Sequence, residues 1–172
     1  ETIQEKIAKN PLIKNKNAKP RIMTITQSTY DGIVYNDEVI KEKLDGKVDI
    51  LHFDEAWLPH AAFSPFYSDM HAIDRNKPRT KKSMVFATHS THKLLAGISQ
   101  ASQICIQDSE TEKLDRSSFN EAFMMHTSTS PQYAIIASCD VAAAMMEGRA
   151  GKALVEESIA EAVYFRRAMR EV

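Results

Sequence analysis

The chain has 172 residues, of which 43% are apolar, and this is enough to bury the core of one domain. Its formal net charge of −1 gives no electrostatic reason to expect a nucleic acid or an anionic membrane as a partner. The apolar runs are too short to span a bilayer, and no signal-like segment opens the sequence. Cys105 and Cys139 lie in apolar surroundings without metal-like spacing, which predicts buried free thiols in a reducing cytoplasm.

The first half of the chain has the pattern of a strand, a helix and a second strand. A short helix is expected over 2–9, and the β-branched residues of 22–26 predict a buried strand. Residues 37–44 predict a helix with acids in its first turn and lysines in its last, which complements the helix dipole. The apolar run 48–53 predicts the next strand. Because this unit spans about thirty residues, we expect the two strands to be parallel neighbours.

Two further strands are expected in the middle of the chain. Residues 55–67 predict an ordered loop with a short helix, and 69–82 predict a polar surface loop. The apolar run Met84–Ala87 predicts the third strand, and 103–107 predicts the fourth. If 94–101 is a loop or a single turn, it is too short for a helical crossover. We therefore expect the fourth strand to pair antiparallel.

The last third of the chain predicts helices. One is expected over 117–125, with Ser117 as its N-cap. The next begins at Ser130-Pro131 and runs to Met146, because serine is a favoured N-cap and proline is favoured at the first helical position. Both helices follow the predicted sheet in the sequence.

Two of the predicted strands end in reactive side chains. Asp54 ends the run 48–53, and the run Met84–Ala87 leads into hydroxyls and imidazoles that finish in Lys93. Parallel neighbours that end this way place an acid and an amine at one edge of a sheet, where open α/β folds bind ligands. The pair suits a cofactor that needs an imine-forming lysine and an acidic partner for a ring nitrogen, and pyridoxal phosphate is such a cofactor.

At these residues the chain resembles a known family. The motifs Ser90-Thr-His-Lys93, Asp54-Glu-Ala-Trp57 and His126-Thr-Ser-Thr-Ser-Pro131 are similar to those of the bacterial arginine/lysine/ornithine decarboxylases. The resemblance runs through nearly the whole chain, and the form Phe86–Leu95 looks closest to the arginine-specific members. It implies an α/β fold, with a mostly parallel sheet and flanking helices, as part of the large domain of a pyridoxal-phosphate-dependent transferase-like enzyme of the aspartate-aminotransferase fold type.

The resembled family has longer chains, so we interpret this chain as part of a larger catalytic subunit. Residues 1–151 then correspond to part of the cofactor-binding domain, and 152–172 to a helix leading toward a C-terminal domain. Gly148 and Gly151 are expected to separate this last helix, 155–172, from the one before it. The family supplies a ring-stacking histidine from an upstream part and assembles as a homodimer or larger homo-oligomer. We therefore expect this piece to be inactive by itself.

Three residues are assigned catalytic roles. Lys93 is expected to form the Schiff base, and desolvation after an apolar strand would lower its pKa and free its amine. Asp54 is expected to pair with the protonated ring nitrogen, which makes the ring an electron acceptor. His92 is expected either to bind the cofactor phosphate or to assist proton transfer at the substrate's α-carbon.

Further residues are assigned to cofactor binding. Ser90 is expected to donate to the phosphate, while Ala56 packs under the ring and Trp57 walls the pocket. The resemblance implies that Ser128, where the family usually has threonine, reaches the phosphate of the partner subunit's cofactor. Thr29 is placed near the phenolic oxygen of the cofactor. The resemblance implies decarboxylation of a basic amino acid, giving carbon dioxide and agmatine if the substrate is arginine.

Two other interpretations stay open at this point. The spacings His-x-Asp and His-x-x-His are common among metal ligands, so a metal-dependent hydrolase using His52, Asp54 and His60, with His89 and His92, is the first alternative. The second is a non-catalytic assembly segment of a larger enzyme, since the chain lacks the stacking histidine. Absorbance at the imine wavelength after addition of pyridoxal phosphate separates these interpretations.

Overall fold

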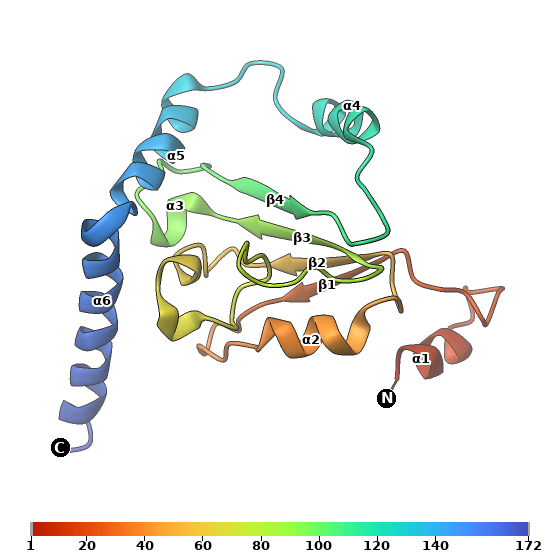
Figure 1. The fold of residues 1–172 in the computed structure, drawn as a ribbon, viewed down its shortest axis with the longest axis horizontal. Coiled ribbons are helices and arrows are strands. Elements are labelled where there is room, and N and C mark those ends of the chain that lie inside the picture. The colour runs from red at the N-terminus through yellow and green to blue at the C-terminus, as the bar shows by residue number, and fades with distance from the viewer. Residues whose placement is uncertain (1, 172) are drawn as a thin grey trace.

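A computed structural model describes residues 2–171 of the chain. Strands β1 (Ile22–Thr26), β2 (Ile50–Asp54) and β3 (Met84–His89) are parallel, and β4 (Gln103–Gln107) joins β3 antiparallel in the order β1-β2-β3-β4 (Figure 1). The predicted parallel pair, the antiparallel fourth strand and the mostly parallel α/β sheet are confirmed. The third strand is two residues longer than predicted, because His89 pairs with Gln103 of β4.

The helices surround the sheet unevenly. In Figure 1, α2 runs along one side of the sheet, and the parallel strands point toward α3 and the long α6. The segment 55–67 holds two short 3-10 helices, where one short helix was predicted, and α6 contacts the first of them. The helices are α1 (Ile3–Lys9), α2 (Asp37–Leu44), η1 (Ala61–Phe63), η2 (Pro65–Tyr67), α3 (Thr91–Leu94), α4 (Arg116–His126), α5 (Tyr133–Met145) and α6 (Gly148–Ala168).

The predicted starts of α4 and α5 are wrong. The carboxylate of Asp115, rather than the hydroxyl of Ser117, caps α4 by accepting hydrogen bonds from the amides of Ser117 and Ser118. Helix α5 begins at Tyr133 after Gln132, so the predicted Ser130-Pro131 start lies in the preceding link. Asp115 provides two acceptor contacts where a serine provides one, which favours the earlier start of α4.

The last helix also starts earlier than predicted. It begins at Gly148, which has a positive φ of 62°, and continues through Gly151. A Cβ at Gly151 would lie 2.1 Å from the carbonyl oxygen of Met146, so this glycine allows α6 to pack closely after α5 instead of ending a helix. The prediction is therefore confirmed for Gly148, which lies at the junction between α5 and α6, and wrong for Gly151, which lies inside α6.

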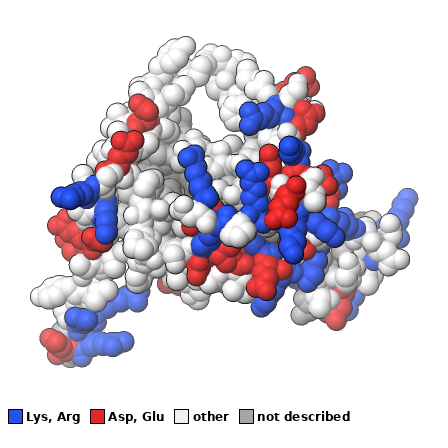
Figure 2. Space-filling view, in the orientation of Figure 1, with Lys and Arg blue, Asp and Glu red and all other residues white. Residues whose placement is uncertain are grey.

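One face of the sheet is the core. Alternation along the strands buries Leu51, Phe53, Val85 and Ala87, and apolar residues of α2 pack over them. Both cysteines are free but only half-buried, which corrects the prediction of buried thiols. The surface shown in Figure 2 mixes lysines and arginines with acids. No helix among residues 2–171 is both long and apolar enough to cross a membrane.

The core face ends in a buried acid at the start of α2. Asp37 is fully buried, and its Oδ2 accepts a hydrogen bond of 2.7 Å from Nε2 of Gln27. Burial, with the charge and hydrogen bond of Glu55, raises the pKa of Asp37 to about 9, while Lys41 and Gln27 act in the opposite direction. Asp37 is therefore neutral at pH 7. Of the two acids predicted to complement the dipole of α2, only Glu38 supplies a charge.

We expect Asp37→Asn to become more stable relative to the natural protein as the pH rises. The raised pKa of Asp37 gives a stabilisation that is fully present below the unfolded value near 3.8 and is lost as the pH rises through about 9. Asparagine keeps an oxygen for Gln27 and never ionises. The thermal midpoint of the variant minus that of the natural protein should therefore increase between about pH 5 and pH 8.

Glu42→Gln is the matched control, because it removes an exposed carboxylate from the same helix. Its thermal midpoint should follow that of the natural protein across the same pH range. A difference for Asp37→Asn that stays flat or decreases with pH would show that Asp37 is ionised in the folded protein.

Candidate active site

The predicted acid and amine lie at one end of the sheet. Asp54 is the last residue of β2 and pairs in register with Thr26 of β1 and Thr88 of β3. Strand β3 then passes through Ser90 into the single turn of α3, which carries Lys93. Because β2 and β3 are parallel, both side chains belong to the carboxyl edge, where such sheets bind ligands.

Lys93 faces the segment that follows Asp54. Its Nζ lies 4.7 Å from the ring centroid of Trp57, three residues beyond the acid. Tyr30 packs edge-to-face on the same indole at 5.7 Å, so the turn after β1 also reaches this place. Lys93 is exposed in this structure, and the prediction of a desolvated lysine is wrong for the chain by itself. Among residues 2–171 only the ring of Trp57 contacts the amine.

Asp54 lies on the face of the sheet opposite the apolar core. It is half-buried, and its Oδ1 accepts a hydrogen bond of 3.1 Å from the amide of Ala56. On the same face, the ring of His52 bridges the hydroxyls of Thr24 and Thr88, at 3.2 and 3.1 Å. The carboxylate thus has a fixed orientation beside a polar row, as a partner for a ligand nitrogen requires.

The turn between β3 and Lys93 presents polar groups. Ser90 is the N-cap of α3, and its hydroxyl makes no capping hydrogen bond within the described chain. Nδ1 of His92 lies 2.8 Å from the carbonyl oxygen of Ala101, and since a carbonyl only accepts, this nitrogen donates. Buried Oγ1 of Thr91 lacks a hydrogen-bond partner among residues 2–171. Pyridoxal phosphate needs donors for its phosphate, an amine for its aldehyde and a carboxylate to accept from its ring nitrogen, so the hydroxyl, imidazole, amine and carboxylate present here fit this group.

Of the two remaining assigned residues, Ser128 lies apart from this cluster and Thr29 lies in the turn after β1. Ser128 is exposed on the link between α4 and α5, which loops away from the sheet in Figure 1. Its Oγ accepts a hydrogen bond of 3.1 Å from the amide of Ser130. Thr29 uses its hydroxyl within its own turn, where it accepts from the amide of Ile33 at 3.2 Å. The structure therefore does not bring Ser128 to Lys93, and a role toward a partner subunit stays a prediction.

The sequence analysis missed the acid next to Asp54. Glu55 is 2% exposed and lies on the core face, where its Oε2 contacts Nε2 of His89 at 2.6 Å. The sequence does indicate this position, because Glu55 is two residues after Phe53 and therefore falls on the same buried face of β2. His89 had been considered only as a metal ligand. Among the described residues no group of three or more potential ligands is arranged to hold a metal ion.

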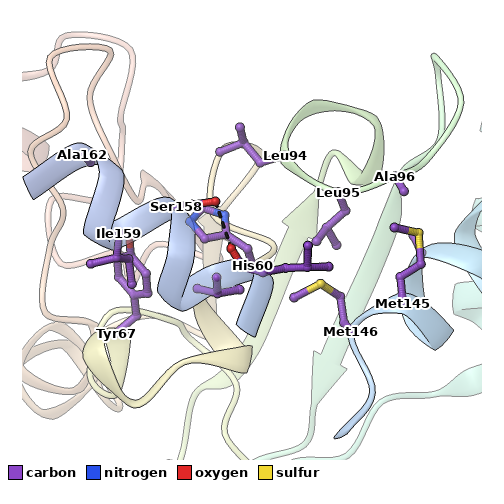
Figure 3. Close-up of a pocket in the computed structure, with 13 residues that line it drawn as sticks. His60, Tyr67, Leu94, Leu95, Ala96, Met145, Met146, Ser158, Ile159 and Ala162 are labelled. Carbon is purple, nitrogen blue, oxygen red and sulfur yellow. Dashed lines mark hydrogen bonds between the residues drawn. The ribbon is translucent and has the colours of Figure 1, made fainter. Parts of the chain in front are cut away.

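An apolar pocket lies beyond α3. It has a volume of about 470 Å³, and Figure 3 shows Tyr67 and Ile159 at one end, Leu95 and Met146 at the other, and His60 between them. Burial lowers the pKa of His60, which favours a neutral imidazole in this setting. Neither Lys93 nor Asp54 lines this pocket. It is therefore separate from the polar cluster at the carboxyl edge.

Comparison with known proteins identifies the family. The family model described as Orn/Lys/Arg decarboxylase, major domain, matches residues 1–172. The chain is 53% identical to the lysine decarboxylase LdcA of Pseudomonas aeruginosa over all of its length and 23% of that protein. It is 48% identical to the biodegradative arginine decarboxylase of Escherichia coli, over 98% of the chain and 22% of that protein.

Solved structures give the same result. Lysine decarboxylase A from Pseudomonas aeruginosa matches with a TM-score of 0.90 and 53% identity, over 100% of this chain and 23% of that one. The constitutive lysine decarboxylase of E. coli matches with a TM-score of 0.83 and 43% identity, over 96% of this chain and 22% of that one. The chain spans less than a quarter of the length of these relatives. It belongs to the Orn/Lys/Arg decarboxylase family and corresponds to a part of its major domain.

Proposed function

We propose that the natural protein carrying this chain decarboxylates a basic amino acid with pyridoxal phosphate. The observation that carries the proposal is the position of the Lys93 amine over the ring of Trp57, three residues beyond Asp54 at the same carboxyl edge of the sheet. Family membership supports the reaction class. Homologues named as decarboxylases of lysine, arginine and ornithine support the class of substrate.

The residues of this chain would divide the work of holding the cofactor. Lys93 would bind it covalently as a Schiff base, and Asp54 would accept the ring N–H and keep that nitrogen protonated. Ser90 would donate to the phosphate. Nε2 of His92 would do so when the imidazole is protonated, because Nδ1 already donates to the carbonyl of Ala101. Ala56 and Trp57 would bound the cofactor ring. When bound, the cofactor accepts the electron pair that is released as the substrate carboxylate leaves as carbon dioxide. The ion pair with Asp54 makes that acceptance easier.

The substrate and the assembly belong to the same proposal. The form of the Phe86–Leu95 motif favours arginine, whereas the relative at 53% identity is a lysine decarboxylase and the one at 48% an arginine decarboxylase. Assay of the natural full-length protein with arginine, lysine and ornithine decides between them. We further propose a cytoplasmic homo-oligomer, in which Ser128 contacts the phosphate of the partner subunit's cofactor.

Replacement of Lys93 by alanine should abolish both cofactor fixation and turnover. In the natural full-length protein, added pyridoxal phosphate should give the visible absorbance of a lysine-bound cofactor, and Lys93→Ala should lose it. Lys113→Ala is the control, because Lys113 is exposed and lies beyond β4. Borohydride reduction and peptide mapping should locate the label on Lys93. A label on another lysine contradicts the assignment, and a natural protein without the band supports the assembly-segment alternative.

Replacement of Asp54 by asparagine should weaken catalysis more than cofactor binding. The amide keeps the shape of the side chain and can still accept from Ala56, but it cannot stabilise a protonated ring nitrogen. We expect kcat to fall at least about a hundredfold while the cofactor stays bound. Asp49→Asn, at the amino end of the same strand, should keep the natural kcat. Full activity in Asp54→Asn would show that another residue serves the ring.

A further inference from the structure

A second polar row crosses the carboxyl edge on the face opposite Asp54. The amide of Gln27 donates to the carbonyl of Asp54 at 2.9 Å, and the amide of Glu55 donates to the carbonyl of Thr88 at the same distance. The parallel ladder thus continues one residue beyond Asp54. Because side chains alternate, Gln27, Glu55 and His89 fall on the core face. Glu55 lies two residues after Phe53 of the core, and His89 lies two residues after Ala87.

Hydrogen bonds tie this row together. Glu55 accepts at both oxygens, from the amide of Ala72 at 2.5 Å and from Nε2 of His89 at 2.6 Å. Gln27 donates to the carbonyl of Met70 at 2.7 Å in addition to Asp37. The Glu55–His89 contact therefore joins the end of β2, which carries Asp54, to the end of β3, which leads into the turn with Lys93. The amide of Ala72 ties Glu55 to the loop between η2 and β3.

The ion pair between Glu55 and His89 is largely removed from solvent. The side chains of Glu55 and His89 are 2% and 15% exposed. Burial favours a neutral imidazole, but the hydrogen bonds to Cys105 and Glu55 outweigh it and raise the pKa of His89 to about 9, so the pair is charged at pH 7. Replacing a buried ion pair by apolar residues is often neutral or stabilising. The main effect of the Glu55–His89 pair is therefore on the positions of the two strand ends that it joins.

Each member of the pair is the chain neighbour of a proposed cofactor-binding residue. Glu55 follows Asp54, and His89 precedes Ser90, which opens the turn to Lys93. We propose that Glu55 and His89 are positioning residues, whose buried hydrogen bond holds the ends of β2 and β3 so that Asp54 and the Ser90–Lys93 turn face one ligand. This inference rests on the proposed function and adds two residues to its site, which would act through Asp54 and the Ser90–Lys93 turn.

Two substitutions of one residue test the pair. In His89→Gln, the longer amide can reach Glu55 from the position of Nε2, whereas in His89→Asn it is one methylene shorter and cannot. Both variants remain polar and uncharged, so they differ mainly in this contact. The measurements are the dissociation constant of pyridoxal phosphate for the natural full-length protein and amide hydrogen exchange over residues 89–93 without cofactor.

We expect His89→Asn to bind the cofactor about tenfold more weakly and to exchange its 89–93 amides about tenfold faster. This is the size of loss found when a residue that orients a direct ligand is removed. His89→Gln should stay within about threefold of the natural protein in both measurements. The proposal is overturned if His89→Asn matches His89→Gln in affinity and exchange.

Ser83→Ala controls for a general loss of stability in the same strand. Ser83 is fully buried before β3, where its Oγ donates to the carbonyl of Val48 at 2.7 Å and accepts from the amide of Gly46 at 2.9 Å. This variant should lower the thermal midpoint but leave cofactor affinity unchanged. A loss of affinity equal to that of His89→Asn would overturn the positioning role. If the natural protein binds no cofactor, the proposed function fails, and the exchange measurement separately decides whether the pair orders the turn.

Discussion

The register of three parallel strand ends is the constraint on which the site depends. Thr26, Asp54 and Thr88 are paired across β1, β2 and β3, and the next residue of each strand points to the opposite face. Alternation therefore separates two kinds of polar group that are adjacent in the sequence. Asp54 faces outward, toward the side with His52, while Glu55 faces into the core. A slip of one residue in β2 would exchange these two acids between faces.

The ionisation of the buried groups follows from this arrangement. Asp37, Glu55 and His89 lie close together behind the edge, and burial disfavours charge on each of them. Glu55 is stabilised as an anion by His89 and by the amide of Ala72, and the neighbouring Asp37 then holds its proton. The cluster behind the edge is thus one ion pair and one neutral acid. Asp54 therefore has no unpaired negative charge next to it from this cluster.

Local patterns predicted the elements of the sheet, whereas long-range contacts decided the details that the sequence analysis missed. The strand–helix–strand unit and the two reactive strand ends are visible in residues 22–54 and 84–93, so the edge was predicted. The extension of β3 to His89 requires pairing with β4, and the passage of α6 through Gly151 requires contact with Met146. Neither contact leaves a periodic signal.

The electrostatic details were hidden for the same reason. Asp37 reads as a helix-starting acid, and only burial beside Glu55 makes it neutral. Glu55 reads as part of a motif with Asp54, and only the alternation of β2 shows that the two serve opposite faces. Lys93 follows an apolar strand, which predicted burial, yet the turn of α3 carries it out of the core. Its exposure depends on which segments cover the edge, and residues 2–171 leave it open.

The turn that carries Lys93 holds its backbone far more firmly than its amine. The amide of His92 donates to the carbonyl of Ala101 at 3.2 Å, and its imidazole donates to the same oxygen. Gly97 approaches so closely that a Cβ there would lie 2.9 Å from that of Ala101, so the turn and the following loop are packed together. Among residues 2–171 the amine contacts only the ring of Trp57, and an exposed cation–π contact contributes about 0.5–1 kcal/mol. A held backbone and a loosely held amine suit the role proposed for Lys93. Its nitrogen would have to change partners while the backbone of the turn stays in place.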